Sequence, residues 1–238
     1  MQRKKAKIIF FLFLFLFYCT THYSSHSYSL GIDFVERAYF NKNGSGGFSL
    51  KVDLTKIGKL ISVIKYINKD YQHITKIIGY NIFSAAEQRL KKIDGISDIR
   101  LKQDKAMLKF TIKFAFENIK VLNKAVDQIN KGLDPTNITY FSFSDELFVR
   151  EDVNGIAKKL LLYKEHDNCL VNSLDLAFFF RDSTYTTIYT FPNKIVDFSN
   201  PFSELTEDKK TIGIAHHIFA IGETDDSISN RIHFENNN

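Results

Sequence analysis

The clearest pattern along the chain is an alternation of apolar and polar positions over residues 108–116. One face takes Leu108, Phe110, Ile112, Phe114 and Phe116, and the other takes Lys109, Thr111, Lys113 and Ala115. A period of two is typical of a half-buried β-strand. Together with residues 96–104, this pattern predicts two paired strands around a turn near Gln103 and Asp104.

Residues 31–57 predict a β-hairpin. The apolar positions are Phe34, Tyr39 and Phe40 in the first strand and Phe48, Leu50 and Val52, which alternate with polar residues, in the second. Between them, the sequence NGSGG at residues 43–47 supplies glycines that adopt positive φ in a turn. Asp53 or Thr55 is placed to cap a helix, because apolar residues recur at helical spacing over residues 57–64.

Helical spacing of apolar residues predicts three more helices, at residues 84–93, 117–133 and 154–163. The first ends before Gly95, which suits the left-handed position after a helix. The second ends at Gly132, shortly before a proline.

The second half of the chain has shorter apolar segments. They predict two strands in residues 138–152, a strand pair in residues 174–192 that turns near residues 181–183, and short strands around a turn at residues 207–209. Because neighbouring strands are joined by tight turns, the pattern favours an α+β fold: antiparallel sheets built from hairpins, with packed amphipathic helices. This domain is expected over residues 31–235, with room for two subdomains divided near residues 133–137.

The N-terminal segment has a different pattern. Residues 8–18 are a continuous apolar run that follows Arg3, Lys4, Lys5 and Lys7. Eleven residues are too few for a membrane-spanning helix, which needs about 20. A basic start, a short apolar run and a polar exit predict a signal peptide at residues 1–18. The alternative is a buried N-terminal helix, but the run lacks the polar face of a globular helix.

Cys19 stands at the end of this run, in an arrangement that resembles the lipobox of bacterial lipoproteins. Leu16 matches the position three before the cysteine, whereas Tyr18 is bulkier than the small residue usual there. The resemblance implies an acylated Cys19, membrane attachment at the cell envelope, and a flexible tether at residues 19–30. Cleavage a few residues later, which would produce a secreted protein, stays open.

Removal of the signal changes the charge of the chain. The whole chain has a formal charge of +5, and residues 1–18 hold four basic residues and no acid, so the remainder is 5 − 4 = +1. A nucleic-acid-binding protein needs an excess of lysine and arginine in its folded part. No nucleic-acid partner is therefore expected.

The cysteines exclude a disulfide framework and a CxxC metal site, because Cys169 is the one cysteine besides Cys19. Cys169 is expected to be a small buried apolar residue. Asn-x-Ser/Thr sequons occur at Asn43 and Asn137. They matter only if the chain is a secreted eukaryotic protein, which is a further alternative.

Several polar stretches are candidates for chemistry. They are Glu165, His166 and Asp167; His216 and His217; the glycines at residues 44–47; and Asp225, Asp226 and Ser227. Adjacent histidines in a strand point to opposite faces and form a poor metal site. Glycines between two strands predict a hairpin turn, since a phosphate loop opens a helix. An envelope hydrolase using His166 or His216 would need converging partners, so we expect no enzyme, no cofactor and no metal.

Aromatic residues in the strands could contact an apolar ligand. The set is Phe110, Phe114, Phe116, Phe141, Phe143, Phe178, Phe179 and Phe180. A packed core is the default for such residues, and a lipid cavity is the alternative. Phe178, Phe179 and Phe180 are the strongest candidates, because three consecutive strand residues place at least one on the outer face.

Three stretches carry a resemblance to known families. They are NKNGSGGFSLKVDLTKI (residues 41–57), GISDIRLKQDKAMLKFTIKFAF (95–116), and YTFPNKIVDFSN with DKKTIGIAHHIF (189–219). They are similar to uncharacterised Bacteroidetes lipoproteins and to the broader LppM-like lipoprotein domain, over most of residues 31–220. The resemblance implies an α+β envelope lipoprotein, with lipid or glycolipid binding in one branch, and it brings no catalytic residue. The expected function is that of a non-enzymatic binding or structural protein whose partner is a lipid or an envelope protein.

Overall fold

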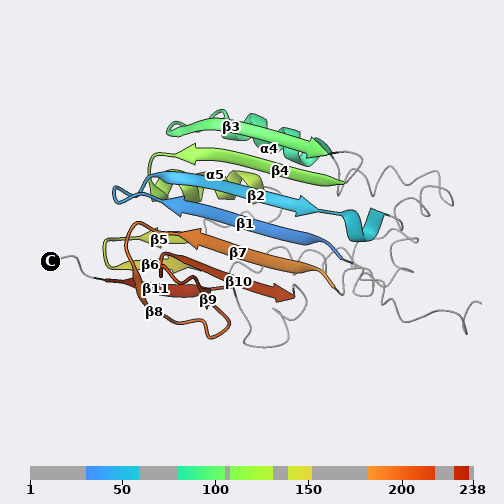
Figure 1. Ribbon diagram of the computed structural model, residues 1–238. Helices are drawn as coiled ribbons and strands as arrows, with labels where there is room; N and C mark the ends of the chain where they lie inside the picture. Colours follow the sequence, from blue (N-terminus) through green and yellow to red (C-terminus); the bar gives the residue numbers. More distant parts are fainter. Residues whose placement is uncertain are drawn as a thin grey trace, which may run out of the picture.

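The structure is a computed structural model that describes residues 31–58, 80–104, 108–130, 139–151, 182–217 and 228–235. These residues form two β-sheets and two longer helices around a shared apolar core (Figure 1). The predicted signal peptide at residues 1–18, the tether at residues 19–30 and the division near residues 133–137 lie outside the described residues.

A seven-stranded sheet has the strand order β3-β4-β2-β1-β7-β10-β9. Its strands are β1 (Asp33–Phe40), β2 (Gly46–Asp53), β3 (Ile96–Asp104), β4 (Lys109–Phe116), β7 (Thr184–Thr190), β9 (Glu204–Leu205) and β10 (Thr211–His217). Every neighbouring pair is antiparallel except β1 and β7, which are parallel. The predicted α+β class with antiparallel sheets is confirmed.

A four-stranded antiparallel sheet has the order β5-β6-β11-β8. Its strands are β5 (Phe141–Phe143), β6 (Leu147–Arg150), β8 (Ile195–Phe198) and β11 (Asn230–Phe234). Phe148 of β6 and Ile232 of β11 belong to the same buried cluster as Phe40 of β1. The small sheet therefore packs against one face of the large sheet, which we call the inner face.

The helices α4 (Tyr80–Leu90) and α5 (Ile119–Asn130) cover the inner face beside the small sheet (Figure 1). The Asn118 side-chain oxygen accepts a hydrogen bond from the Val121 amide at 3.1 Å and caps the start of α5. Both predicted helices are present, and Gly95 has the expected positive φ of 86°. The helix predicted at residues 154–163 lies outside the described residues.

The turns agree with the sequence in two places and differ in one. Gly44 has φ 76° in the predicted hairpin, and the turn at residues 207–209 joins Thr206 to Thr211. The strand pair predicted around Gln103 and Asp104 is confirmed, but its turn comes slightly later than predicted, because β3 continues through Asp104, which pairs with Lys109. The strand pair predicted in residues 174–192 is wrong, because β7 lies between β1 and β10 in the sheet and pairs with both of them.

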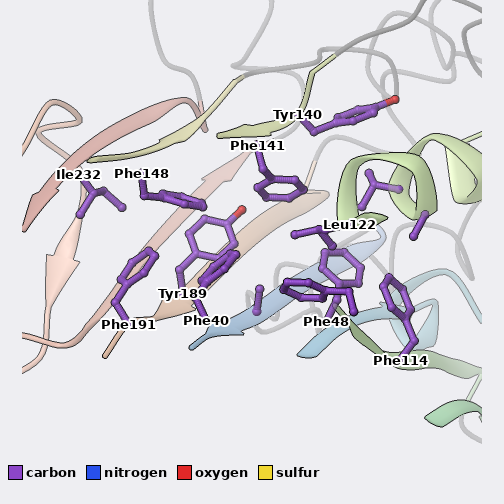
Figure 2. Close-up of a cluster of buried hydrophobic side chains, with 14 of the residues drawn as sticks. Phe40, Phe48, Phe114, Leu122, Tyr140, Phe141, Phe148, Tyr189, Phe191 and Ile232 are labelled. Atoms are coloured by element: carbon purple, nitrogen blue, oxygen red, sulfur yellow. The ribbon is translucent and has the colours of Figure 1, made fainter. Parts of the chain in front are cut away.

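Aromatic rings dominate the core (Figure 2). Phe40 lies at its centre, with ring centroids of Phe143, Phe148 and Phe191 at 5.0–5.4 Å. The apolar face predicted for residues 108–116 is confirmed: Phe110, Ile112, Phe114 and Phe116 are all buried. Offset and edge contacts of this kind stabilise a core beyond the area that they bury.

Candidate functional site

The inner face changes from aromatic to polar along β1. Even-numbered residues of β1 point inward, so Glu36 lies on the same face as Ala38 and Phe40. Glu36 is 1 % exposed, and its neighbour across the parallel pair with β7 is Thr187, also 1 % exposed. A buried carboxylate needs compensating partners because its transfer from water is costly.

Arg150, at the end of β6, supplies the main partner. Its Nε donates to Glu36 Oε1 at 3.1 Å, and its Nη2 donates to Oε2 at 3.2 Å. This two-point geometry is the strong form of an arginine–carboxylate pair. Because Glu36 belongs to the large sheet and Arg150 to the small one, the pair joins the two sheets.

Two tyrosines of β7 complete the cluster. Tyr185 donates its hydroxyl to Glu36 Oε2 at 2.6 Å, and the Tyr189 hydroxyl donates to Oε1. The Arg150 guanidinium also donates to the Glu151 carbonyl and lies 4.8 Å from the centroid of the Phe141 ring. We call Glu36, Arg150, Tyr185 and Tyr189 the buried ionic cluster.

The protonation states follow from this arrangement. Burial alone would lower the pKa of Arg150, but the Glu36 carboxylate outweighs it and holds the pKa above the ordinary value. Burial raises the pKa of both Tyr185 and Tyr189, and the nearby carboxylate raises it further. The tyrosines thus remain protonated donors at neutral pH, and all four side chains are engaged with one another.

Two buried polar atoms next to this cluster have no hydrogen-bond partner among the described residues: Thr187 Oγ1 and His216 Nε2. His216 is opposite Tyr185 in the pairing of β10 with β7, and Thr187 is opposite Ile214, so the two lie diagonally on the inner face. The Phe202 ring stands edge-on to His216 at 5.3 Å and is 56 % exposed. We call Thr187, His216 and Phe202 the unpartnered site.

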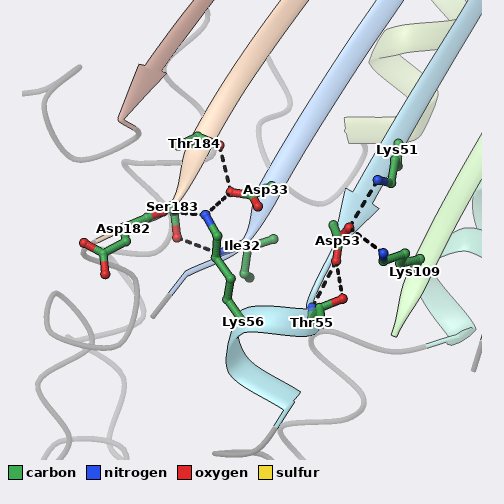
Figure 3. A network of polar contacts seen from close by, with 10 residues as sticks. All are labelled: Ile32, Asp33, Lys51, Asp53, Thr55, Lys56, Lys109, Asp182, Ser183 and Thr184. Carbon is green, nitrogen blue, oxygen red and sulfur yellow. Dashed lines mark hydrogen bonds and ion pairs between the residues drawn. The ribbon is translucent and has the colours of Figure 1, made fainter. Parts of the chain in front are cut away.

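A second polar network lies at the end of the large sheet where β1 begins (Figure 3). Asp33 accepts hydrogen bonds from Lys56 Nζ at 2.7 Å and Thr184 Oγ1 at 2.8 Å. The Ser183 hydroxyl oxygen accepts the Ile32 amide at 2.9 Å. These contacts fix the start of β1 against the start of β7.

Asp53, at the end of β2, is the other centre of this network (Figure 3). It forms ion pairs with Lys51 at 3.1 Å and Lys109 at 3.4 Å, and it accepts hydrogen bonds from the amide and hydroxyl of Thr55. Burial by itself raises the pKa of Asp53, but the Thr55 hydrogen bonds and Lys51 outweigh it, so the pKa lies below the ordinary value. The carboxylate also acts as the cap predicted for the turn of helix at residues 55–58.

The prediction that the two adjacent histidines point to opposite faces of a strand is confirmed. His216 is buried on the inner face of β10, and His217 is exposed on the outer face. The glycines of residues 44–47 lie in and after the predicted hairpin turn, where Asn43 Oδ1 accepts the Ser45 amide at 3.1 Å. Of the aromatic candidates, Phe110, Phe114, Phe116 and Phe141 are buried, and Phe143 packs against the cluster that contains the last three.

The other candidates lie outside the described residues and stay predictions: Cys19, Asn137, Glu165, His166, Asp167, Cys169, Phe178, Phe179, Phe180, Asp225, Asp226 and Ser227. Within the described ranges, no group of three or more His, Cys, Asp or Glu side chains could hold a metal ion. None of the helices in that part of the chain combines the length and apolarity that a bilayer crossing needs.

Sequence reasoning missed the buried ionic cluster and Thr187. A signal for Glu36 was present, because it is in phase with Phe34 and Phe40 on the face of β1 that carries the apolar residues. A charged residue at a core position of a strand indicates a buried partner. No pattern in the sequence pointed to Arg150, which lies 114 positions later.

No family model and no curated protein matches this chain. Among solved structures, the chain is similar to the NMR structure of the folded domain of the LppM protein from Mycobacterium tuberculosis. The alignment covers 89 % of this chain and 94 % of that domain, with a TM-score of 0.40 and 5 % sequence identity. A likeness of this degree carries no argument about function, and the resemblance to Bacteroidetes lipoproteins stays a prediction.

Proposed function

We propose that the protein is an exported lipoprotein, held at a membrane of the cell envelope by an acylated Cys19, and that its α+β domain binds a partner without catalysing a reaction. The observation that carries this proposal is the order of the N-terminal sequence: four basic residues, an apolar run, Cys19 and a polar stretch. The first strand begins at Asp33, so 14 positions (33 − 19) separate it from Cys19. That length suits a tether between a membrane and a folded domain.

The buried ionic cluster supports binding over catalysis. A catalytic nucleophile or base needs a partner within hydrogen-bond reach that activates it. In the part of the chain that the structure describes, the two charged side chains of the cluster, the Glu36 carboxylate and the Arg150 guanidinium, are paired with each other. His216 Nε2 has neither a carboxylate nor a hydroxyl partner there.

The intact mass of the protein from the membrane fraction of its native host tests the anchor. We expect the mass of residues 19–238 plus acyl chains, and we expect the substitution Cys19→Ser to move the protein into the soluble fraction. Several acyl chains are needed for stable attachment. A mass that shows later cleavage without lipid would instead identify a secreted protein.

A second candidate function is the binding of a lipid or another small molecule at the unpartnered site. The supporting observation is that Thr187 Oγ1 and His216 Nε2 are buried without partners, beside the exposed ring of Phe202. A ligand that carries a polar group beside an apolar one would form hydrogen bonds with Thr187 Oγ1 and His216 Nε2 and would cover the Phe202 ring.

Native mass spectrometry of protein purified from the membrane fraction tests this second function. We expect a bound small molecule on the wild type and much less of it on Thr187→Val. The matched control is Thr186→Val, because Thr186 is the neighbouring residue of β7 on the opposite face. Equal retention by all three proteins would count against a ligand at this site.

A further inference from the structure

The outer face of the large sheet carries cations in two adjacent rows. In the first row, Arg100 of β3 is opposite Lys113 of β4, Lys113 is opposite Ser49 of β2, and Ser49 is opposite Arg37 of β1. Neighbouring strands are about 4.8 Å apart. Three cations therefore stand along one line across four strands.

The second row continues the pattern one pair further along the strands. Lys102 of β3 is opposite Thr111 of β4, which is opposite Lys51 of β2. Arg37, Arg100, Lys102 and Lys113 are all exposed, and none of these four forms an ion pair with another described residue. We call these four residues the cationic face.

The acids of β1 to β4 that are paired across the sheet on this side lie in one row at its end. They are Asp33, Asp53 and Asp104. Asp98 is exposed in the bulge of β3 between Ser97 and Arg100. Asp33 is paired with Lys56, and Asp53 with Lys51 and Lys109 (Figure 3). The nearest acid in the row of Arg37 is Glu204, three strands away beyond Ile188 and Gly213. None of the described acids thus forms an ion pair with a residue of the cationic face.

The arrangement has a cost in stability. Arg100 and Lys113 are directly opposite each other in an antiparallel pair. Like charges at directly opposite positions destabilise a sheet. A nearby anion would reduce this repulsion, so binding of an anionic partner would stabilise the protein.

We propose that the cationic face binds the surface of an anionic phospholipid bilayer. Basic residues are attracted to anionic lipids over about a Debye length from the membrane. Tyr39, which is 54 % exposed on the same side of β1, has the amphipathic ring that favours the headgroup region. The attachment would turn the outer face of the sheet toward the membrane and leave α4, α5 and the small sheet facing away.

This inference rests on the proposed anchor, which brings the membrane within reach. The 14 positions from Cys19 to Asp33 span at most about 50 Å when fully extended. A tether of this length holds the face near the lipid, and a high effective concentration lets weak electrostatic contacts become populated. Nucleic acid is the competing partner for a basic face, but the chain after residue 18 has a net charge of only +1.

Lysine acetylation of the full protein, reconstituted in vesicles, tests the proposal. One preparation uses phosphatidylcholine alone, and the other contains about one third phosphatidylglycerol. On the anionic vesicles at physiological salt, we expect acetylation of Lys102 and Lys113 to slow by about tenfold. Lys124, exposed on α5 on the other side of the molecule, serves as the internal control and should react equally on both.

Paired variants sharpen the test while keeping both reporter lysines. Arg37→Gln with Arg100→Gln should reduce the protection to about twofold or less, because two of the four cations are gone. Lys92→Gln with Lys194→Gln removes the same charge from exposed positions after α4 and before β8, and should leave the protection unchanged.

Two results would overturn the proposal. One is equal acetylation of Lys102, Lys113 and Lys124 on anionic vesicles. The other is equal protection by short duplex DNA without vesicles, which would identify a general polyanion surface. The intact mass of the same preparation reports on Cys19 separately, so failure of the anchor and failure of the cationic face are distinguishable.

Discussion

The inner face of the large sheet has an aromatic half and a polar half, and β1 contributes to both. At one end, Phe40 is surrounded by the rings of Phe148 and Phe191. Four residues earlier, Glu36 is surrounded by Arg150 and the tyrosines of β7. Both halves are almost completely closed to solvent, and both join the large sheet to the small one.

The two halves stabilise the same interface by different physics. Apolar burial is non-directional, so the aromatic half gains free energy in proportion to the area that it removes from water. The polar half depends on geometry, because a buried ion pair offsets its desolvation cost only when its hydrogen bonds are satisfied. The free-energy cost of losing one partner is therefore harder to predict in the polar half than in the aromatic half.

The largest expected effect comes from emptying the aromatic half. Phe148 is fully buried and contacts the rings of Phe40, Tyr189 and Phe191 at 5.0–5.2 Å. We expect Phe148→Ala to lower the free energy of unfolding by about 3–5 kcal/mol, measured by urea denaturation, because of lost burial and the cavity left behind. Phe202→Ala is the control on an exposed ring, and a comparable loss there would contradict the assignment of the core.

Breaking the ion pair should cost about 3 kcal/mol. Glu36→Gln keeps the size of the side chain but leaves the Arg150 guanidinium buried without a counter-charge. The same urea denaturation measures the loss. It tests whether the polar half behaves as a coupled unit.

The control for the ion pair is the double variant Glu36→Leu with Arg150→Met. We expect it to be more stable than Glu36→Gln, since no buried charge remains. Tyr185 and Tyr189 lose their acceptor in this variant, which keeps it below the wild type. If the double variant loses as much stability as the single variants Glu36→Leu and Arg150→Met lose together, Glu36 and Arg150 are not coupled.

The aromatic half was largely predictable from the sequence. The alternation over residues 108–116 identified the buried face of β4, and the glycine turn located the hairpin of β1 and β2. The pairing of β1 with β7 was not predictable, because its partners lie 151 positions apart and strand periodicity does not specify which strands meet. The turn after β3 was misplaced for a related reason, since polar residues near Asp104 are equally compatible with a strand edge.

The polar half was missed because polar residues are usually assigned to the surface. Glu36 was detectable by its phase in β1, but its partners come from β6 and β7, which the fold alone brings together. The sequence instead directed attention to Phe178, Phe179 and Phe180 and to Cys19, which lie outside the described residues. Patterns along a chain locate faces and termini, whereas contacts between distant strands require the structure.

A smaller effect of opposite sign is expected next to the buried ionic cluster. Thr187 Oγ1 is buried without a partner among the described residues, so its hydroxyl is a cost in the free protein. We expect Thr187→Val to raise the free energy of unfolding by about 1 kcal/mol. Thr186→Val on the outer face should change it by less than about 0.5 kcal/mol. If Thr187→Val destabilises the protein, the Thr187 hydroxyl has a hydrogen-bond partner in the folded protein. Only His216 Nε2 would then support the unpartnered site.

The smallest expected effect concerns Asp53, whose ion pairs lie at the surface in contrast to the buried pair. Its folded-state pKa is below the ordinary value, so its contribution to stability is present above about pH 4 and is lost as the pH falls through the folded-state pKa. Asp53→Asn preserves an acceptor for the Thr55 amide and removes the charge. We expect it to lower the free energy of unfolding at pH 7 by about a few tenths of a kcal/mol, since exposed pairs are screened.

This difference between wild type and Asp53→Asn should shrink as the pH falls through the folded-state pKa of Asp53, where the wild-type carboxyl also becomes protonated. High salt at pH 7 should reduce it as well, because the pairs with Lys51 and Lys109 are accessible to ions. The Glu36–Arg150 pair, which is closed to solvent, should show no such loss in salt. Equal salt sensitivity of Asp53→Asn and Glu36→Gln would show that water and ions reach the buried ionic cluster, and the contrast between the surface and buried pairs would not hold.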